Sequence, residues 1–396
     1  MSVLFTPGSI GEVEIGNRFV HAATYEAMAE EDGGVSDLLL RRYARLAREE
    51  VGLIIPGIMI VHPLGNVPGR AIGIHDDAMV PGLRKLVDAV HEQGAKIFFQ
   101  LLHAGAQTNR QTIGRPPLAP SRTGFNPMYL NRARAMSEEE IWEAVRAFGD
   151  AARRAAEAGA DGVHLAASGG YLLNEFLSPF FNHRDDDWGG SDEKRFRIVR
   201  EVIREVKESL SPGMAVTVKL TANDYTPGDG MTTPLAARYA AMMAEAGIDA
   251  LEIASGCTTY SGWHIWRGDV PVKELVRDLP AWQKPAAWVA FRRMVGKFDF
   301  EEGYNLRDAE TIKPAIGDVP FILVGGLRRL EHMEEVVESG GADFVALSRP
   351  LVREPSLVRK FREGTATAAS CTSCNKCFAE VVHRKPLRCL ASGRER

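Results

Sequence analysis

Eight short apolar runs, each followed by a segment with helical patterning, constrain this chain most strongly. The runs are mostly apolar and rich in β-branched or aromatic residues, which is typical of strands buried on both faces. Strands that alternate with helices predict a parallel sheet, and eight such units predict a (β/α)8 TIM barrel. The active site of such a barrel lies at the C-terminal ends of its strands. The runs are Phe19–Ala22, Gly52–Gly57, Lys96–Gln100, Gly162–Ala166, Ala215–Lys219, Ala250–Ala254, Pro320–Val324 and Asp343–Leu347.

The segments between the runs carry ordinary helix signals. Ser137 and Glu140 form a capping box that opens a helix running to Gly159. The phrases Ala158–Asp161 and Ala246–Asp249 indicate helix ends that lead into the next strand. Further helices are expected over residues 36–50, 79–93, 192–209, 234–246, 305–315 and 329–339.

The remaining segments suggest additions to the barrel. We expect residues 1–18 to form a hairpin that closes its bottom. Residues 104–135 and 255–304 are too long for ordinary loops, so we expect them over the active site. The sequence thus predicts a barrel over 1–363 and a four-cysteine metal-binding segment over 364–396.

Composition narrows the classes of partner. The net charge of −4 supplies no basic field, which argues against nucleic acid as a partner. No apolar stretch approaches the roughly 20 residues of a membrane span, and the first residues lack the pattern of a signal peptide. The chain is therefore expected to be cytoplasmic, with no membrane partner and a small-molecule substrate. A homo-oligomer is left open.

Two neighbouring strand ends favour phosphate binding. The seventh run leads into Val324–Arg328 and the eighth into Ser348–Pro350. The loops after strands seven and eight are the usual phosphate site of this fold, because glycines let backbone N–H groups approach the anion.

Five motifs together resemble the FMN-dependent old yellow enzyme family. They are Gln100–Gly105, Gly170–Pro179, Trp188–Ser191, Val324–Arg328 and Ala346–Pro350. The likeness covers about the first 365 residues in the expected order. It implies a barrel that holds FMN noncovalently and works as an oxidoreductase.

The resemblance also implies which residues would bind FMN. Gln100 would hydrogen-bond the pyrimidine edge of the flavin. Lys219, where the family more often has Arg, would lie near N1 and O2, where a cation stabilises the anionic reduced flavin. A salt bridge inside the barrel is the alternative role for Lys219. Ala23, Thr24 and Gly57 would contact the flavin, and Gly325, Gly326, Ser348 and Arg349 would hold its phosphate.

Four cysteines crowd the C-terminal segment. Cys371, Cys374, Cys377 and Cys389 are similar to the iron–sulfur segment of the branch that contains bacterial 2,4-dienoyl-CoA reductase and trimethylamine dehydrogenase. The resemblance implies a [4Fe-4S] cluster, although four thiolates also suit a Zn site, and reduced thiols without a metal are a third alternative. Cys257 stands apart and is expected to be a buried apolar residue.

The substrate side departs from the common family pattern. Ala166 and Gly169 stand where most members have the pair that anchors a carbonyl oxygen. His164 shares a face with Ala166 but lies one layer deeper, which favours an interior role. The iron–sulfur branch instead implies Tyr171 as a catalytic proton donor and His264 as a catalytic residue that tunes this proton or polarises an oxygen.

These residues predict hydride transfer between FMN and an activated C=C bond, as in an enone or an enoyl thioester. One alternative is an N-demethylating amine dehydrogenase, in which Tyr260, Trp263 and Trp266 would cage an alkylammonium group. The other is a flavin electron-transfer protein. Since no Gly-x-Gly-x-x-Gly motif follows a predicted strand, we expect electrons from NAD(P)H directly or from a separate electron-transfer protein through the cluster.

Overall fold

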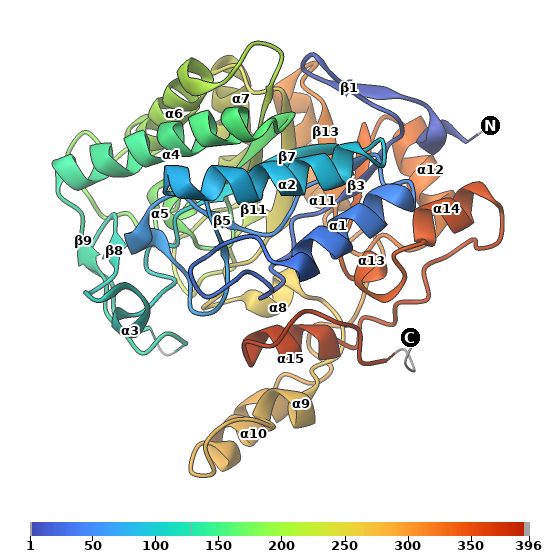
Figure 1. The fold of residues 1–396 in the computed structure, drawn as a ribbon. Helices are drawn as coiled ribbons and strands as arrows, with labels where there is room; N and C mark the ends of the chain where they lie inside the picture. The colour runs from blue at the N-terminus through green and yellow to red at the C-terminus, as the bar shows by residue number, and fades with distance from the viewer. Residues whose placement is uncertain (1, 127, 392–396) are drawn as a thin grey trace.

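The eight predicted strands form a closed parallel barrel in the computed structural model, which describes residues 2–126 and 128–391 (Figure 1). The hydrogen-bonded order is β10-β11-β12-β13-β14-β3-β4-β7, and β7 pairs with β10 to close the ring. This confirms the (β/α)8 prediction. The strands are β3 (Phe19–His21), β4 (Leu53–Ile54), β7 (Lys96–Leu102), β10 (Gly162–Ala167), β11 (Ala215–Asn223), β12 (Ala250–Ser255), β13 (Phe321–Val324) and β14 (Phe344–Leu347).

Helices surround the barrel and follow the predicted pattern (Figure 1). The capping box of Ser137 and Glu140 opens α4 as expected. The helix expected over 305–315 ends earlier, at Ile312, and continues as a 3-10 turn, because Pro314 has no N–H for an α-helical bond. The outer helices are α1 (Asp37–Arg48), α2 (Val80–His91), α4 (Glu138–Ala158), α6 (Asp192–Ser209), α7 (Thr233–Glu245), α11 (Leu306–Ile312), α12 (Leu330–Glu338), α13 (Arg349–Arg353) and α14 (Leu357–Arg362).

An aspartate just before each of β10, β12 and β14 fastens the preceding strand of the barrel. Each carboxylate accepts a hydrogen bond from the backbone N–H at the start of that neighbouring strand, a group that would otherwise lack a partner. The segments Ala158–Asp161 and Ala246–Asp249, which were predicted as helix ends, therefore also fix the register between neighbouring strands. The bonds run from Ile97 N to Asp161 (2.9 Å), from Val216 N to Asp249 (2.7 Å) and from Phe321 N to Asp343 (2.8 Å).

The N-terminal segment closes the bottom of the barrel, as expected. Strands β1 (Gly8–Ile10) and β2 (Val13–Ile15) form an antiparallel hairpin. Its apolar side chains join Phe98, Ala215 and the interior ends of the other strands in one buried cluster. The hairpin tip, Gly11, has a positive φ of 56°, and an added Cβ would lie 2.8 Å from Asp249 Oδ1.

Two long insertions and the cysteine segment complete the fold. Residues 104–135 contain α3 (Arg110–Ile113), β8 (Leu118–Ala119) and β9 (Arg134–Ala135), and residues 255–304 contain α8 (Gly262–Ile265), α9 (Val272–Val276) and α10 (Lys284–Arg292). The cysteine segment carries α15 (Lys376–Val382), which packs against α9 (Figure 1). Its last five residues, 392–396, lie outside the described residues, as does Met1.

A helix that crosses a bilayer must be about 20 residues long and predominantly apolar. Among the described residues, no helix is both long and apolar enough to cross a membrane. The expected cytoplasmic location stays a prediction.

Replacing Asp249 by Ala should lower the free energy of unfolding by about 1–2 kcal/mol, because the Val216 N–H loses a charged acceptor. Urea denaturation followed by circular dichroism would measure the change. The matched control is Asp229→Ala, which removes an exposed carboxylate that makes no hydrogen bond among the described residues. Equal losses in the two variants would contradict the strand-fastening role.

Candidate active site at the mouth of the barrel

The ends of the first and last barrel strands are joined by two hydroxyl groups. Thr24 Oγ1 donates to Ala22 O (2.8 Å) and lies 2.8 Å from Ser348 Oγ. Since the Thr24 proton is used on the carbonyl, Ser348 donates to Thr24. The structure therefore brings Thr24 and Ser348 together, although they are 324 positions apart.

A buried charge cluster lies inside the barrel. Glu252 has no exposed surface and lies 2.6 Å from Lys219 Nζ and 3.4 Å from His164 Nε2. The other ring nitrogen of His164 lies 2.8 Å from Thr217 Oγ1. Burial by itself would raise the pKa of Glu252, but Lys219 and His164 lower it to about 2. The cluster therefore keeps Glu252 ionised, and His164 has the interior role that its position predicted.

Glu252 was not predicted as a site residue, although the sequence contains a signal for it. It is a single acidic residue in the apolar strand β12, and Lys219 is a single basic residue in β11. The two are directly opposite in the register of these strands. The salt bridge named as the alternative role of Lys219 is present, and the Lys219 side chain is also 14% exposed, so it still reaches the mouth of the barrel.

Gln100 provides a polar group that the protein itself does not use. The residue is 5% exposed, and its side-chain amide makes no hydrogen bond to any described residue. Buried amides are normally hydrogen-bonded, so a polar ligand at the mouth would satisfy this group.

Gly57 lies against a buried carboxylate that the sequence analysis did not identify. Its N–H donates to Glu26 Oε1 (3.0 Å) and to Tyr43 Oη (3.1 Å). Any side chain at position 57 would collide with Glu26 and Thr24, so glycine is required there. Burial raises the pKa of Glu26 to about 7, although Arg42 acts against this shift.

The predicted phosphate loop has the backbone of a glycine turn. Gly325 and Gly326 have φ values of 131° and 74°, which favour glycine. A Cβ at Gly325 would lie 2.7 Å from Asn305 Nδ2, whose amide donates to Val324 O (2.7 Å). The loop is thus held close to Asn305. Its glycines are needed for this close packing, and they would also let an anion approach the backbone.

Arg349, one of the residues predicted to hold the phosphate, links the end of β14 to the cysteine segment. Its Nη1 donates to Arg267 O (2.8 Å) and to Asn375 Oδ1 (2.6 Å). Arg349 therefore ties three parts of the chain together: the end of β14, the long insertion after β12 and the cysteine segment.

Tyr171 follows a sharp turn at the end of β10. Gly169 and Gly170 have φ values of 67° and 82°, and a Cβ at Gly170 would lie 2.5 Å from Cys257 Sγ. Burial raises the pKa of Tyr171, and a hydrogen bond with Thr258 partly offsets this shift. Cys257 is fully buried, as expected, and burial raises its pKa to about 12.

Two further tyrosines near Tyr171 were missed. Tyr25 packs with Tyr171 in one apolar cluster, and its hydroxyl is buried without a hydrogen-bond partner among the described residues. Burial raises the pKa of Tyr25 to about 12 and that of Tyr129 well above its usual range, with Tyr171 adding to both shifts. The position of Tyr25, next to Thr24 at a strand end, was the available signal.

His264 lies in a different environment from Tyr171. Its ring stacks on Tyr225 (centroids 3.8 Å apart, planes at 10°) and meets the edge of Phe298. Burial lowers the pKa of His264, and Arg267 lowers it further. No interaction joins His264 to Tyr171 among the described residues, and the catalytic role of each stays a prediction.

The three aromatic residues of the proposed cage take part in two separate sets of ring contacts. Tyr260 packs on Phe180, with centroids 5.1 Å apart, and on Phe181. Trp266 instead packs on Phe378 of α15, with centroids 3.9 Å apart, and Trp263 contacts the same ring. The rings of Trp263 and Trp266 also contact each other, with centroids 6.5 Å apart, and no ring contact joins them to Tyr260 among the described residues. The cage stays a prediction.

The four cysteines of the C-terminal segment line one small cavity, together with Arg349 and Arg353. Arg353 Nη1 lies 3.8 Å from Cys389 Sγ. Burial raises the pKa of Cys377 to about 11, although Arg349 acts against this shift. Among the described residues, no three His, Cys, Asp or Glu side chains are grouped closely enough to hold a metal ion. The four cysteine sulfurs therefore surround one cavity, but they lie farther apart than the ligands of a single metal ion.

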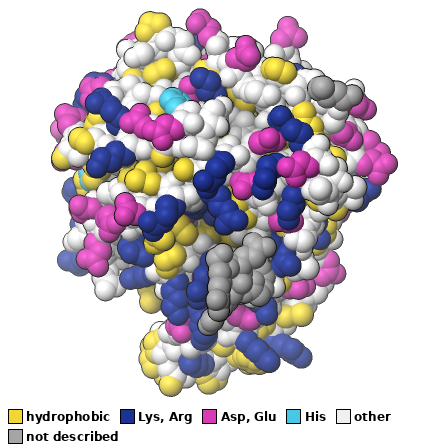
Figure 2. All heavy atoms as spheres, turned by 45° about the vertical axis from the view of Figure 1, so that its right-hand side comes forward, with side chains coloured by type: hydrophobic (Ala, Val, Ile, Leu, Met, Phe, Trp, Pro, Cys, Tyr) yellow, Lys and Arg dark blue, Asp and Glu magenta, His cyan; other side chains and the backbone are white. Residues whose placement is uncertain are grey.

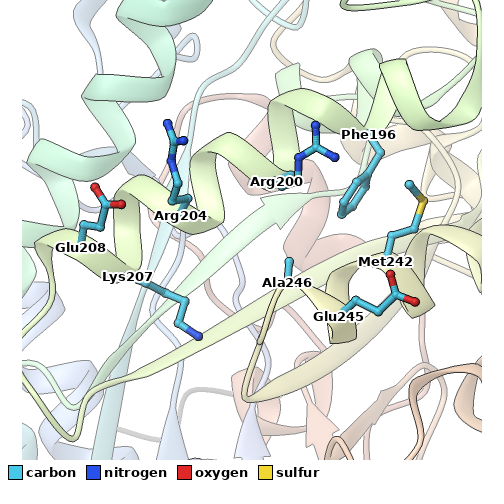
Figure 3. A pocket seen from close by; sticks show the side chains of 8 residues that line it. All are labelled: Phe196, Arg200, Arg204, Lys207, Glu208, Met242, Glu245 and Ala246. Carbon is cyan, nitrogen blue, oxygen red and sulfur yellow. The ribbon is translucent and has the colours of Figure 1, made fainter.

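A larger hollow lies on the outside of the barrel and is separate from this mouth. It is an open groove of about 640 Å³ between α6 and α7 (Figure 3). None of the predicted site residues lines it. The lining residues are Phe196, Arg200, Arg204, Lys207, Glu208, Met242, Glu245 and Ala246.

Comparisons with known proteins agree on one family. Residues 3–265 match the model of the NADH:flavin oxidoreductase / NADH oxidase family. The chain is 34% identical over 400 residues to NADH oxidase from Thermoanaerobacter brockii, covering 99% of this chain but only 56% of that protein. It is 32% identical over 379 residues to 4,4'-dithiodibutanoate disulfide reductase from Rhodococcus erythropolis, covering 96% of this chain and 93% of that protein.

A solved structure shows the same fold. The complex of 2-naphthoyl-CoA reductase with 2-naphthoyl-CoA superposes with a TM-score of 0.85 at 24% identity, covering 98% of this chain and 57% of that chain.

Replacing Lys219 by Met should lower the free energy of unfolding by about 3 kcal/mol without any ligand, because Glu252 then keeps a buried charge with one cation fewer. The double variant Lys219→Met/Glu252→Gln should recover more than half of this loss. Lys96→Met is the control, since it removes a 40%-exposed ammonium from Asp161 and should cost at most about 1 kcal/mol. A double variant no more stable than Lys219→Met would contradict the argument.

Proposed function

Because this chain belongs to the NADH:flavin oxidoreductase / NADH oxidase family, we propose that it transfers hydride between FMN and an activated C=C bond, as in an enone or an enoyl thioester. It is a flavin-dependent oxidoreductase built on a (β/α)8 barrel. The observation that carries the proposal is the set of polar groups at one mouth: the linked Thr24 and Ser348, the unpartnered Gln100 amide and the Lys219 ammonium.

These residues fit a flavin mononucleotide. Gln100 would hydrogen-bond the pyrimidine edge, and Lys219, held by Glu252, would supply positive charge beside it. Ala23, Thr24 and Gly57 would border the ring, and the phosphate would lie against Gly325, Gly326, Ser348 and Arg349. When bound, FMN supplies an N5 atom that accepts or donates hydride.

Tyr171 is proposed as the proton donor to carbon. Its raised pKa keeps the phenol protonated at neutral pH, as a general acid must be. In reduction of the double bond, the β-carbon takes hydride and the α-carbon takes the Tyr171 proton, which solvent then replaces. The apolar cluster around Tyr25 and Tyr171 would exclude water from this side of the site.

A second candidate substrate class is an organic disulfide. The relative with nearly the same length is named for the reduction of 4,4'-dithiodibutanoate disulfide. Hydride delivered to one sulfur would break the S–S bond and release the other sulfur as a thiolate. The amine dehydrogenase alternative has less support, because no ring contact joins Tyr260 to Trp263 or Trp266 among the described residues.

The cysteine segment is proposed to bind a [4Fe-4S] cluster, and a bound cluster would place the chain in the iron–sulfur branch. Four cysteines line one cavity, and the guanidinium groups of Arg349 and Arg353 would balance the negative charge of a thiolate-bound cluster. Zinc is less favoured, because a single ion needs four sulfurs within about 2.3 Å of one point. Electrons would come from NADH or NADPH at the flavin, or through the cluster from a separate electron-transfer protein.

Replacing Tyr171 by Phe should slow reoxidation of the reduced flavin by an enone or enoyl thioester about 100-fold or more, because the proton donor is lost. Reduction of the flavin by NADH or dithionite should be unchanged. Anaerobic stopped-flow spectroscopy of the FMN-loaded protein measures both half-reactions. Equal slowing of both would count against the proton-donor role.

The same measurement with 4,4'-dithiodibutanoate tests the second candidate. Reoxidation by the disulfide at an undiminished rate in Tyr171→Phe, with no reaction of any enone or enoyl thioester, would replace the C=C proposal by disulfide reduction.

Anaerobically purified protein should contain about four iron and about four acid-labile sulfide per chain. Cys377→Ser should lose most of this iron, because one ligand of the cluster is removed, whereas Cys257→Ser should retain it. Metal analysis by mass spectrometry with a sulfide assay gives both values. About one zinc per chain and no sulfide would assign the segment to zinc instead.

A further inference from the structure

A short segment after α9 projects from the body of the protein beside the cysteine segment (Figure 1). We define this projection as residues 280–298, which contain α10. No residue of α10 is buried. Trp282 is 78% exposed and Trp288 39%, and Val289 and Val295 are about half exposed. Large aromatic residues are uncommon on a surface that faces only water, so this patch indicates an interaction site.

The charges of the projection all have one sign. Residues 280–298 contain four basic residues and no Asp or Glu, in a chain whose net charge is −4. All four are exposed, and none forms an ion pair with a described residue. Figure 2 shows Lys and Arg side chains gathered at the lower end of the molecule, near exposed apolar side chains. The four are Lys284, Arg292, Arg293 and Lys297.

The projection is firmly attached to the cysteine segment through α9. Lys376 Nζ lies 3.1 Å from Glu274, and Arg277 Nη2 lies 2.7 Å from Glu380. Lys385 makes a further ion pair with α9's C-terminal flank. Helix α15, which carries Cys377, is thus fixed against the base of the projection.

The two faces of the projection differ in their contacts. Phe291, Met294 and Phe298 pack inward, on a buried cluster that includes Trp263 and Ala379 of α15. The tryptophans at 282 and 288 have no place in this cluster. The inward face therefore explains how the projection holds its shape, and the outward face is left without a partner in the described chain.

We propose that the projection is the docking surface for an acidic protein that carries single electrons. Aromatic residues and arginines dominate the binding energy of protein interfaces, and unpaired cations favour an acidic partner. The attachment to the cysteine segment favours such a carrier over a lipid surface, because the carrier must reach a redox group. This inference rests on the proposed cluster. Two reduced carriers, each losing one electron, and one solvent proton would together convert bound FMN to its anionic hydroquinone.

The test measures binding of two acidic probes, a flavodoxin and a [2Fe-2S] ferredoxin, to the full chain loaded with FMN. Titration calorimetry at low salt should show binding that weakens as salt is raised. The variants Arg292→Glu/Arg293→Glu and Trp282→Ala/Trp288→Ala should each weaken it about tenfold or more. The matched control, Lys85→Glu/Arg146→Glu, reverses two exposed charges on α2 and α4 and should change it less than about twofold.

Four results would overturn the proposal. Neither probe binds the unaltered chain, or both bind all variants equally. Binding of the unaltered chain to vesicles of anionic phospholipid, lost in Trp282→Ala/Trp288→Ala, would assign the projection to a membrane surface. Self-association that both variants abolish in sedimentation would assign it to a second copy.

The proposed hydride transfer is tested independently of the docking surface. Enone reduction by dithionite-reduced protein bypasses the projection, so it should be unchanged in these variants. Its absence from the unaltered chain would refute the hydride-transfer proposal while leaving the binding results valid.

Discussion

The carboxylate of Glu252 has no contact with solvent, and the centre of the barrel is arranged around that charge. An isolated ionised carboxylate in an apolar interior is very costly, so cations must accompany it. Lys219 supplies a cation from β11, and the ring of His164 on β10 lies 3.4 Å from the same carboxylate. The consequence at the mouth is a lysine held in place rather than free in solvent. A fixed cation of this kind stabilises negative charge on a ligand without reorganising, which is the physical basis of the proposed flavin chemistry.

Hydrogen bonds join the mouth of the barrel to the cysteine segment on two sides, so the two parts form one continuous unit. Leu387 N donates to Glu26 O (2.8 Å), and the Glu26 carboxylate accepts from Gly57 at the end of the second barrel strand. On the other side, Arg349 follows the last barrel strand and bonds Asn375. A change at the cysteines therefore has a direct route of packed and hydrogen-bonded groups to the proposed flavin site.

The sequence predicted the fold well because its signals are local. Apolar runs, capping residues and helix ends depend on near neighbours in the chain, and the strands lie where those signals placed them. The polar site was predicted less completely. Glu252 and Glu26 each lie among apolar neighbours and matter only because distant groups, Lys219 and Gly57, are folded against them. The same limit applies to the aromatic residues of the long insertion, since Phe378 packs on Trp263 and Trp266 but lies more than a hundred positions from them in the chain.

By itself, the sequence determined the barrel, the family of flavin-dependent oxidoreductases and the candidate residues at the strand ends, because periodicity and motifs are properties of the linear chain. The tertiary structure decided which of these residues meet. It placed Lys219 on Glu252, gathered the four cysteines around one cavity, stacked His264 on Tyr225 and left the tryptophans of the projection exposed. Closure of the barrel brings Lys219 and Glu252 together. The packing of residues 255–304 against α15 sets the contacts beside the cysteine segment. Such contacts between remote segments have no local signature in the chain.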